Sequence, residues 1–415
     1  MSRHVRKHRV FRSAEPALFS DSWEELIPAD HAVRKMRQIL ESLDLSYLEA
    51  LYPVQGGVAY DPRRLLAVIL YGIGDGVRSS RQLQEHCRYD NRYRFLMDGQ
   101  TPDDRTFSRF QERLTEDPEV LLERIMAFAK ERVTLRAVSV DGTKVRASVS
   151  RYAGARPLRP LADPDSRKMK DRHGYAFAYN CQLGVDADSK LIVGVVLSQD
   201  PSDWGLLAPT LDSVARATGR YPNAVIADRG YESARNAHWC QQAGIASHLS
   251  PNPQIWQGWQ LDENNQIVCP AGHSLVTKDQ YRADGRTTQR YRIQECPRCP
   301  LRESCLPTAT KYRSLTTPVG IDPTPRIQNL YRARSQEGVL LLRQRSVLSE
   351  TPHAQLKQND GMRQFLRRGK AKAFADLLLW VVSYNIRKLL MPFIWLWSQL
   401  FDRKLARGTP QLAAA

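Results

Sequence analysis

Three acidic residues, far apart in the chain, have the types and settings that a metal-dependent phosphoryl-transfer site requires. Asp141 and Asp228 each end a short apolar run of the β-strand type, and Glu350 lies far downstream in a basic segment of helical character. Carboxylate oxygens are the preferred ligands of hard divalent cations, and a pair of such ions stabilises the attacking and leaving oxygens of an in-line displacement. We therefore predict that Asp141, Asp228 and Glu350 are catalytic and bind Mg²⁺ or Mn²⁺.

The chain carries a large excess of positive charge. Its 415 residues include 61 lysines and arginines against 44 aspartates and glutamates, which gives a formal net charge of +17. Such an excess favours a polyanionic partner through counterion release, so nucleic acid is the natural phosphodiester substrate. A basic protein without such a partner is the alternative interpretation of the charge alone.

The first 130 residues read as helical. Asp61-Pro62, Ser79-Ser80 and the stretch from Thr101 to Asp104 each provide a helix cap before an apolar run of helical spacing. The third of these helices presents a row of three arginines on its outward side. Short helices with such a row suggest a helix-turn-helix-like DNA reader, but a plain helical bundle with a solvated basic face explains the pattern equally well. The arginines are Arg105, Arg109 and Arg113.

A mixed α/β pattern follows the helical segment. Apolar alternation predicts strands at residues 138–140, 176–185, 191–197, 224–227 and 245–249, and helices at 204–218 and 231–243. Strands that alternate with helices indicate a mixed α/β core. Asp141 and Asp228 would stand at the carboxyl ends of strands, where such sheets usually place their sites. Asp203 is either an accessory acid or, as we prefer, the cap of the helix that begins near Trp204.

Residues 251–325 interrupt this core with a stretch rich in Pro, Gly, Asn, Gln and Cys, for which we expect little regular structure. Its cysteines have the close spacing of a zinc site, and a segment with so little core of its own gains most from a metal clip. The alternative is a loop of reduced cysteines without a metal. The predicted Zn²⁺ ligands are Cys296, Cys299 and Cys305, completed by Cys269 or His273. Three further cysteines read as packing residues of helices or strands, namely Cys87, Cys181 and Cys240.

A helix is predicted again from about residue 336 to 357. Arg343, Glu350 and Lys357 recur every seven residues, so they share one face of this helix. A metal-bound glutamate between cations that contact DNA phosphates fits this spacing, and a salt-bridged surface helix also explains it.

Several motifs, in this order, resemble the transposases of bacterial insertion sequences that have an Asp-Asp-Glu triad, a ribonuclease H-like core and, in one subgroup, a cysteine-rich insertion. The stretch around Glu350 departs from the family's usual Glu-Pro-x-Phe-Gly, because this chain has Glu350-Thr-Pro-His-Ala354, and a proline two residues after the glutamate disturbs a helix locally. The motifs are Thr101-Pro-Asp-Asp-Arg-Thr-Phe107, Val140-Asp-Gly-Thr-Lys144, Tyr179-Asn-Cys-Gln182, Ala227-Asp-Arg-Gly-Tyr231, Arg345 and Lys357 around Glu350, Arg367-Arg-Gly369 and Tyr384-Asn385.

The resemblance implies an α/β fold with four parts: a helical N-terminal DNA-binding domain at 1–130, a catalytic core at 131–250 that resumes with C-terminal helices at 326–415, and the cysteine-rich insertion at 251–325. It implies binding of terminal inverted repeats and target DNA, metal-dependent strand cleavage and strand transfer, and a homo-oligomer on DNA. A catalytically impaired or domesticated DNA-binding protein, and a nuclease without strand transfer, are the alternatives. The implied phosphate contacts are Lys144, Arg343, Arg345 and Lys357.

No secretory signal is visible, and no apolar run reaches the roughly 20 residues that span a bilayer. We therefore expect a bacterial cytoplasmic protein, associated with the nucleoid and not with a membrane.

Overall fold

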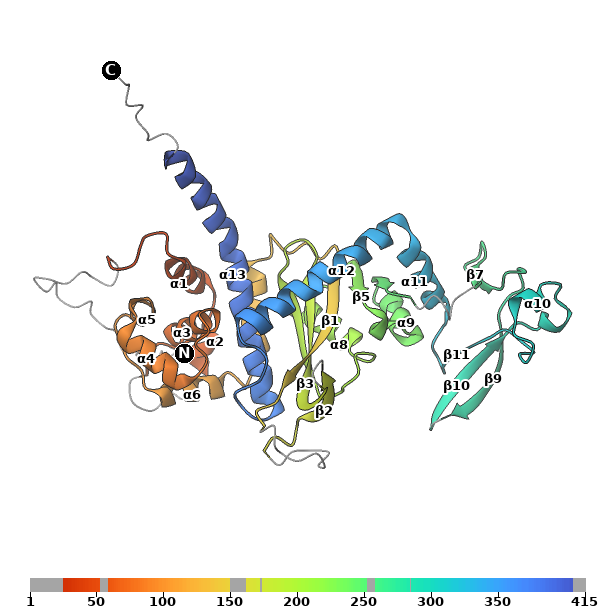
Figure 1. Ribbon diagram of the computed structural model, residues 1–415, viewed down its shortest axis with the longest axis horizontal. Coiled ribbons are helices and arrows are strands. Elements are labelled where there is room, and N and C mark those ends of the chain that lie inside the picture. Colours follow the sequence, from red (N-terminus) through yellow and green to blue (C-terminus); the bar gives the residue numbers. More distant parts are fainter. Residues whose placement is uncertain are drawn as a thin grey trace, which may run out of the picture.

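The computed structural model describes residues 25–52, 59–149, 162–171, 174–251, 258–283 and 285–405. Among these residues, no helix combines the length and apolar character that crossing a lipid bilayer requires. Helices lie at one end of the molecule, a sheet lies in the middle, and a small separate sheet lies at the other end (Figure 1).

The described chain up to Phe128 is helical, and its helices begin where the sequence places caps. The Asp61 carboxylate accepts a hydrogen bond from the N–H of Arg63, and Pro62 occupies the first turn. Ser79 forms a capping box with Gln82, and Asp103 caps a third helix, so all three predicted helix starts are confirmed. The helices are α1 (Ala32–Ser42), α2 (Tyr47–Ala50), α3 (Pro62–Gly74), α4 (Ser80–Tyr89), α5 (Asn91–Leu96), α6 (Asp104–Arg113) and α7 (Glu119–Phe128).

The central sheet is mixed, in agreement with the predicted α/β class. Its order is β2-β3-β1-β5-β6, and β4 also pairs with β3. The strands β2, β3, β1 and β4 pair antiparallel, whereas β1, β5 and β6 run parallel to one another. The strands are β1 (Val138–Arg146), β2 (Arg167–Asp171), β3 (Gly174–Asp186), β4 (Ile192–Ser198), β5 (Ala224–Ala227) and β6 (Ala246–Leu249).

Helices cover both faces of this sheet, and strand alternation decides which residue faces which helix. Val138 and Val140 pack in one core with α8 (Leu207–Thr218). Ser139, between them, points the other way and hydrogen-bonds to Ser349 of α12 (Gln336–Ala354) at 3.0 Å. The helices α9 (Ala234–Gln242) and α11 (Thr324–Arg334) pack on β6, and α13 (Lys370–Leu405) lies between the N-terminal helices and β4 (Figure 1).

Residues 258–325 have more regular structure than their composition predicts, which corrects our expectation. The strands contain many arginines, threonines and glutamines, and therefore lack the apolar alternation that identifies a half-buried strand. The strand at 276–283 is largely exposed, whereas the strand at 286–292 is mostly half-buried. A small core containing Trp259, Ile267, Ile293 and Leu315 holds the unit together and reaches α11. The elements are β7 (Gln260–Leu261), β8 (Ile267–Val268), β9 (Val276–Ala283), β10 (Arg286–Arg292), η2 (Cys296–Arg298), α10 (Arg302–Cys305) and β11 (Ser314–Pro318).

The helix α12 continues through Pro352, although proline removes one helical hydrogen bond and crowds the preceding turn. The chain leaves the regular helix only at Ala354, where a wider π-type turn, η3 (Gln355–Asn359), follows. The face that carries Leu341, Leu348 and Pro352 is buried along the helix, so packing against the sheet compensates for the proline.

A buried ion pair joins the segment after η3 to α13. Asp360 is fully buried, and both guanidinium nitrogens of Arg387 donate to its carboxylate, one of them at 2.8 Å. Removing one partner of such a pair leaves an uncompensated buried charge. We predict that Arg387→Leu lowers the free energy of unfolding by about 3–5 kcal/mol, measured by urea unfolding followed by circular dichroism.

The matched control is Arg136→Leu, which breaks the exposed pair of Arg136 with Asp188, 2.9 Å apart. This change should cost less than about 1 kcal/mol. Equal losses for the two variants would contradict the prediction.

Candidate active site

Strand pairing brings Asp141 and Asp228 together. The parallel ladder of β1 and β5 ends with Val140 opposite Ala227, and the two aspartates are the next residues on each strand. By alternation, both face α12. Asp228 directly follows β5, as predicted. Asp141 does not end its strand, because β1 continues to Arg146 in pairing with β3 alone.

The two carboxylates are electrostatically coupled. Burial raises the pKa of Asp141 to about 6, and the negative charges of Asp228 and Asp203 act in the same direction. The N–H of Gly142, which donates to Asp141 Oδ1 at 3.0 Å, and the charge of Arg345 oppose that rise in the pKa. This is the environment of a carboxylate pair that a bound cation would stabilise.

The helix α12 brings a histidine to this pair. His353 Nε2 lies 3.7 Å from Asp141 Oδ2, and burial lowers the pKa of His353 to about 4, so the imidazole is neutral at pH 7. His353 was noted in the sequence only as a departure from the family motif. Its spacing of three residues from Glu350, which places the two side chains near one another on a helix, was the signal available.

Glu350 lies on the same helix with an exposed side chain. Within the described ranges, no three His, Cys, Asp or Glu side chains come close enough together to hold a metal ion. The donor chemistry of Asp141 and Asp228 fits a divalent cation, whereas the participation of Glu350 stays a prediction.

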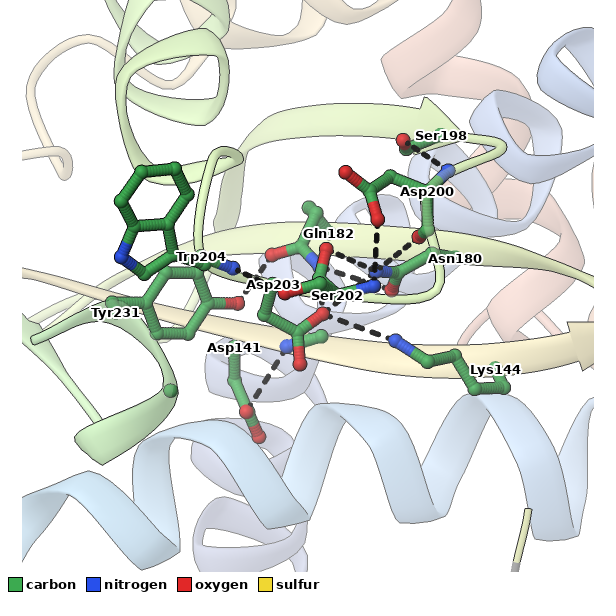
Figure 2. A network of polar contacts seen from close by, with 12 residues as sticks. Asp141, Lys144, Asn180, Gln182, Ser198, Asp200, Ser202, Asp203, Trp204 and Tyr231 are labelled. Atoms are coloured by element: carbon green, nitrogen blue, oxygen red, sulfur yellow. Dashed lines mark hydrogen bonds and ion pairs between the residues drawn. The ribbon is translucent and has the colours of Figure 1, made fainter. Parts of the chain in front are cut away.

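Asp203 belongs to this site and does not cap a helix, which corrects our preferred interpretation. The helix α8 begins only at Leu207, after a turn in which the N–H of Leu206 donates to the Asp203 carbonyl. The Asp203 carboxylate accepts three hydrogen bonds at Oδ1, shown in Figure 2. The donors are Lys144 Nζ at 3.1 Å, Asn180 Nδ2 at 2.7 Å and Gln182 Nε2 at 2.8 Å.

The predicted phosphate contacts fall into two groups. The positive charge of Arg345 lowers the pKa of Asp141. Lys144 forms an ion pair with Asp203, and Lys357 donates a hydrogen bond to the main-chain carbonyl of Lys144 at 3.0 Å. Arg343 is exposed two residues before Arg345 on α12.

The predicted arginine row of the N-terminal helices lies on α6. Arg105 and Arg109 are exposed, whereas the Arg113 guanidinium stacks over the Tyr52 ring, 4.2 Å from its centroid. Two of the three arginines are therefore accessible to a partner, and the third has a packing role. Helix α6 packs against α4, an arrangement that both the helix-turn-helix and the bundle interpretation allow.

The four predicted zinc-binding cysteines line one cavity of the small sheet unit, together with His273 and Arg313. The backbone N–H of Arg313 donates to Cys296 Sγ at 3.3 Å, and its guanidinium donates to Cys305 Sγ at 3.0 Å. Cys269 and Cys299 complete the set, and all four are free thiols. The remaining cysteines, Cys87, Cys181 and Cys240, are buried in the main core, as predicted for packing residues.

Two family models match the chain, at opposite ends of it. A model described as a transposase domain (DUF772) matches residues 21–113, and a model described as a transposase DDE domain matches residues 268–390. The second match includes Glu350 and the cysteine-rich unit but not Asp141 or Asp228. No curated protein matches the chain.

Two kinds of transposase complex stand among the similar solved structures. The piggyBac transposase synaptic complex with hairpin DNA aligns over 92% of this chain and 86% of its own, with 11% identity and a TM-score of 0.26. The Mos1 transposase paired-end complex with left transposon end aligns over 48% and 62%, with 15% identity and a TM-score of 0.17.

The two family-model matches, one to a transposase domain and one to a transposase DDE domain, identify an enzyme with DNA transposase function. The chain is a DNA transposase.

The raised pKa of Asp141 predicts a pH-dependent stability. Its charged form is disfavoured in the folded protein, so stability falls as the pH rises from about 4 to about 6 and stays reduced above that. We predict that Asp141→Asn, without divalent ions, is more stable than wild type at pH 7.5 by up to about 3 kcal/mol, from about 1.4 kcal/mol per pKa unit. The difference should vanish near pH 4, as urea unfolding in EDTA would show.

Asp186→Asn is the control, because Asp186 lies at the end of β3 and its carboxylate is well hydrogen-bonded. It accepts hydrogen bonds from the N–H of Leu135 and from the N–H and hydroxyl of Ser189. The same substitution there removes acceptors and should destabilise the protein. A destabilised Asp141→Asn at pH 7.5 would refute the coupling of the acidic pair.

Proposed function

We propose that this transposase binds the terminal inverted repeats of its insertion sequence and cuts and joins DNA at a centre formed by Asp141, Asp228 and Glu350. The observation that carries the proposal is the placement of Asp141 and Asp228 side by side where the β1–β5 ladder ends. The sheet order supports a ribonuclease H-like core, because antiparallel strands precede two parallel ones around a central first strand.

In this proposal, the acidic residues hold Mg²⁺ or Mn²⁺, which when bound supplies activation of the attacking oxygen and stabilisation of the leaving oxygen. Asp141 and Asp228 are fixed by neighbouring strands, and Glu350 approaches from α12. A water oxygen attacks the phosphorus at the element's end and the bridging bond breaks, which frees a 3′-hydroxyl. That hydroxyl then attacks a target phosphodiester by the same in-line path, without a covalent protein intermediate.

The cations around the site would position the DNA backbone. Arg343 is exposed on α12, and the charge of Arg345 acts on Asp141. Lys144 lies on the opposite face of β1 and is paired with Asp203, and Lys357 donates to the main-chain carbonyl of Lys144. We assign end recognition to the N-terminal helices, where Arg105 and Arg109 are accessible, and expect two protomers to hold two ends.

The test is cleavage and joining of a DNA that carries the element's ends. Asp141→Ala, Asp228→Ala and Glu350→Ala should each lose at least about 100-fold in rate with Mg²⁺, since even outer-sphere substitutions cost about 10–100-fold. EDTA should abolish the reaction of the wild-type protein. Gel analysis separates cleaved from joined products.

The control is Glu337→Ala, which removes an exposed glutamate from the first turn of the same helix, α12. It should keep the wild-type rate. Cleavage without joining would favour a nuclease. End binding by a wild type that never cuts would favour a catalytically impaired or domesticated DNA-binding protein, with the altered Glu350 segment as the cause.

We further propose that the cysteine-rich unit binds one structural Zn²⁺ through Cys269, Cys296, Cys299 and Cys305. Support comes from the donor types, since four thiols line one cavity and two of their sulfurs accept N–H bonds from Arg313. Such outer hydrogen bonds are typical around metal-bound sulfur. No three of the described cysteines stand close enough together to hold an ion in this structure, so zinc binding would have to draw the thiols together. The unit's small apolar core gives a metal a clear stabilising role.

We predict that Cys299→Ser lowers the zinc content of the purified protein from one ion per chain to background, as measured by plasma mass spectrometry. Cys299 is only partly buried, so the change itself perturbs packing little. Cys240→Ala, at a buried cysteine of the main core, should keep its zinc. Wild-type protein purified without zinc would refute this part of the proposal.

A further inference from the structure

We propose that Asp203 is a positioning residue that fixes the strand of Asp141 and the turn of Asp228 relative to each other. The inference rests on the proposed function, in which these two aspartates do the chemistry. Asp203 lies in the loop after β4, outside every element that carries a member of the triad (Figure 2).

The first connection runs from Asp203 to the strand of Asp141. Gly142 follows Asp141 on β1, and a side chain there would collide with Asp203, because a Cβ on Gly142 would stand 2.7 Å from Asp203 Oδ1. Lys144, two residues further, places its ammonium 3.1 Å from the same oxygen. Gly142 and Lys144 share the face of β1 opposite to Asp141, so Asp203 supports that strand from behind.

The second connection runs from Asp203 to the turn of Asp228. Gln182 of β3 donates to Asp203 and accepts the hydroxyl of Tyr231, which is fully buried three residues after Asp228. Asn236 makes a parallel main-chain connection, since its amide donates to the carbonyls of Trp204 at 2.9 Å and Tyr231 at 2.7 Å.

The glycine of this turn confirms how closely the loop approaches. A Cβ on Gly230 would lie 3.0 Å from Asp228 Oδ1 and 3.9 Å from the Cβ of Asp203. Gly230 also donates its N–H to Asp228 Oδ1 at 2.8 Å, which orients that carboxylate. Asp203 therefore lies close to Gly142, next to Asp141, and to Gly230, in the turn of Asp228.

Charge explains why an aspartate suits this position. The three donors converge on one oxygen of Asp203. The Lys144 side chain is only 17% exposed, so its ammonium needs an anion beside it. An asparagine can still accept from Asn180 and Gln182 through its single oxygen, but it provides no counter-charge for Lys144. An alanine loses all three bonds and removes the anion beside the Lys144 ammonium, whereas Asn180 and Gln182 keep other acceptors.

The experiment compares Asp203→Ala and Asp203→Asn with wild type by hydrogen exchange of the metal-free protein and by the Mg²⁺ dependence of end cleavage. Asp203→Ala should raise the exchange rate of the amides of Gly230 and Tyr231 about 10-fold and raise the half-saturating Mg²⁺ concentration about 10–100-fold. The affinity for end DNA should stay within twofold. Asp203→Asn keeps the acceptor oxygen but not the charge, so it should recover part of both effects.

The control is Asp186→Ala, which removes an equally well-bonded carboxylate from the far end of β3. It should lower the unfolding temperature while leaving the exchange of the Asp228 turn and the Mg²⁺ requirement unchanged. Unchanged exchange and an unchanged Mg²⁺ requirement in Asp203→Ala would overturn the inference. So would an Asp203→Asn variant as impaired as Asp203→Ala.

The two proposals fail in different ways. Faster exchange in Asp203→Ala, together with a wild type that cleaves nothing in Mg²⁺, would sustain the positioning role and refute the proposed function. Normal cleavage by Asp203→Ala at wild-type Mg²⁺ concentrations would refute the positioning role and leave the proposed function intact.

Discussion

The active-site region depends on one constraint, the point at which β5 stops pairing with β1. The ladder ends at Val140 and Ala227, so the next residue on each strand must be a neighbour of the other. Two carboxylates are thereby forced together on the face beneath α12, partly buried and mutually repulsive. Repulsion favours either moving the two carboxylates apart or protonating one of them. A rigid surrounding is therefore needed to hold the pair in place.

That rigidity comes from buried polar contacts on both sides of the sheet. Ser139 and Ser349 join β1 to α12 on the acidic face, and Asp203, Gln182 and Tyr231 join the two aspartate motifs through β3. Buried polar networks stabilise one arrangement strongly when every member is satisfied. The long α13 then packs the N-terminal helices onto the same core, so the arginines of α6 and the acidic pair belong to one packed body.

Local patterns predicted what short-range physics decides. The caps at Asp61, Ser79 and Asp103 and the strands flanking Asp141 and Asp228 follow from a few adjacent residues. The position of Asp203 did not follow, because its partners lie on β1 and β3, far away in sequence, and an aspartate before an apolar helix reads as a cap. The strands of the small unit were missed for a related reason, since strands rich in polar residues carry no apolar alternation.

The cysteine-rich unit shows how a polar segment becomes ordered without a large core. Its buried residues are few, and two of them, Cys269 and Cys296, are themselves cysteines that line the common cavity. A tight turn begins at each of them, with Gly272 N–H donating to the Cys269 carbonyl and Cys299 N–H to that of Cys296. The second turn keeps Cys296 and Cys299 near each other. The small apolar core and the cavity lined by the cysteines therefore occupy the same part of the unit. The central strand β10 connects this end to the rest of the unit, because its Tyr291 pairs with the buried Leu315 of β11 and packs against the same core.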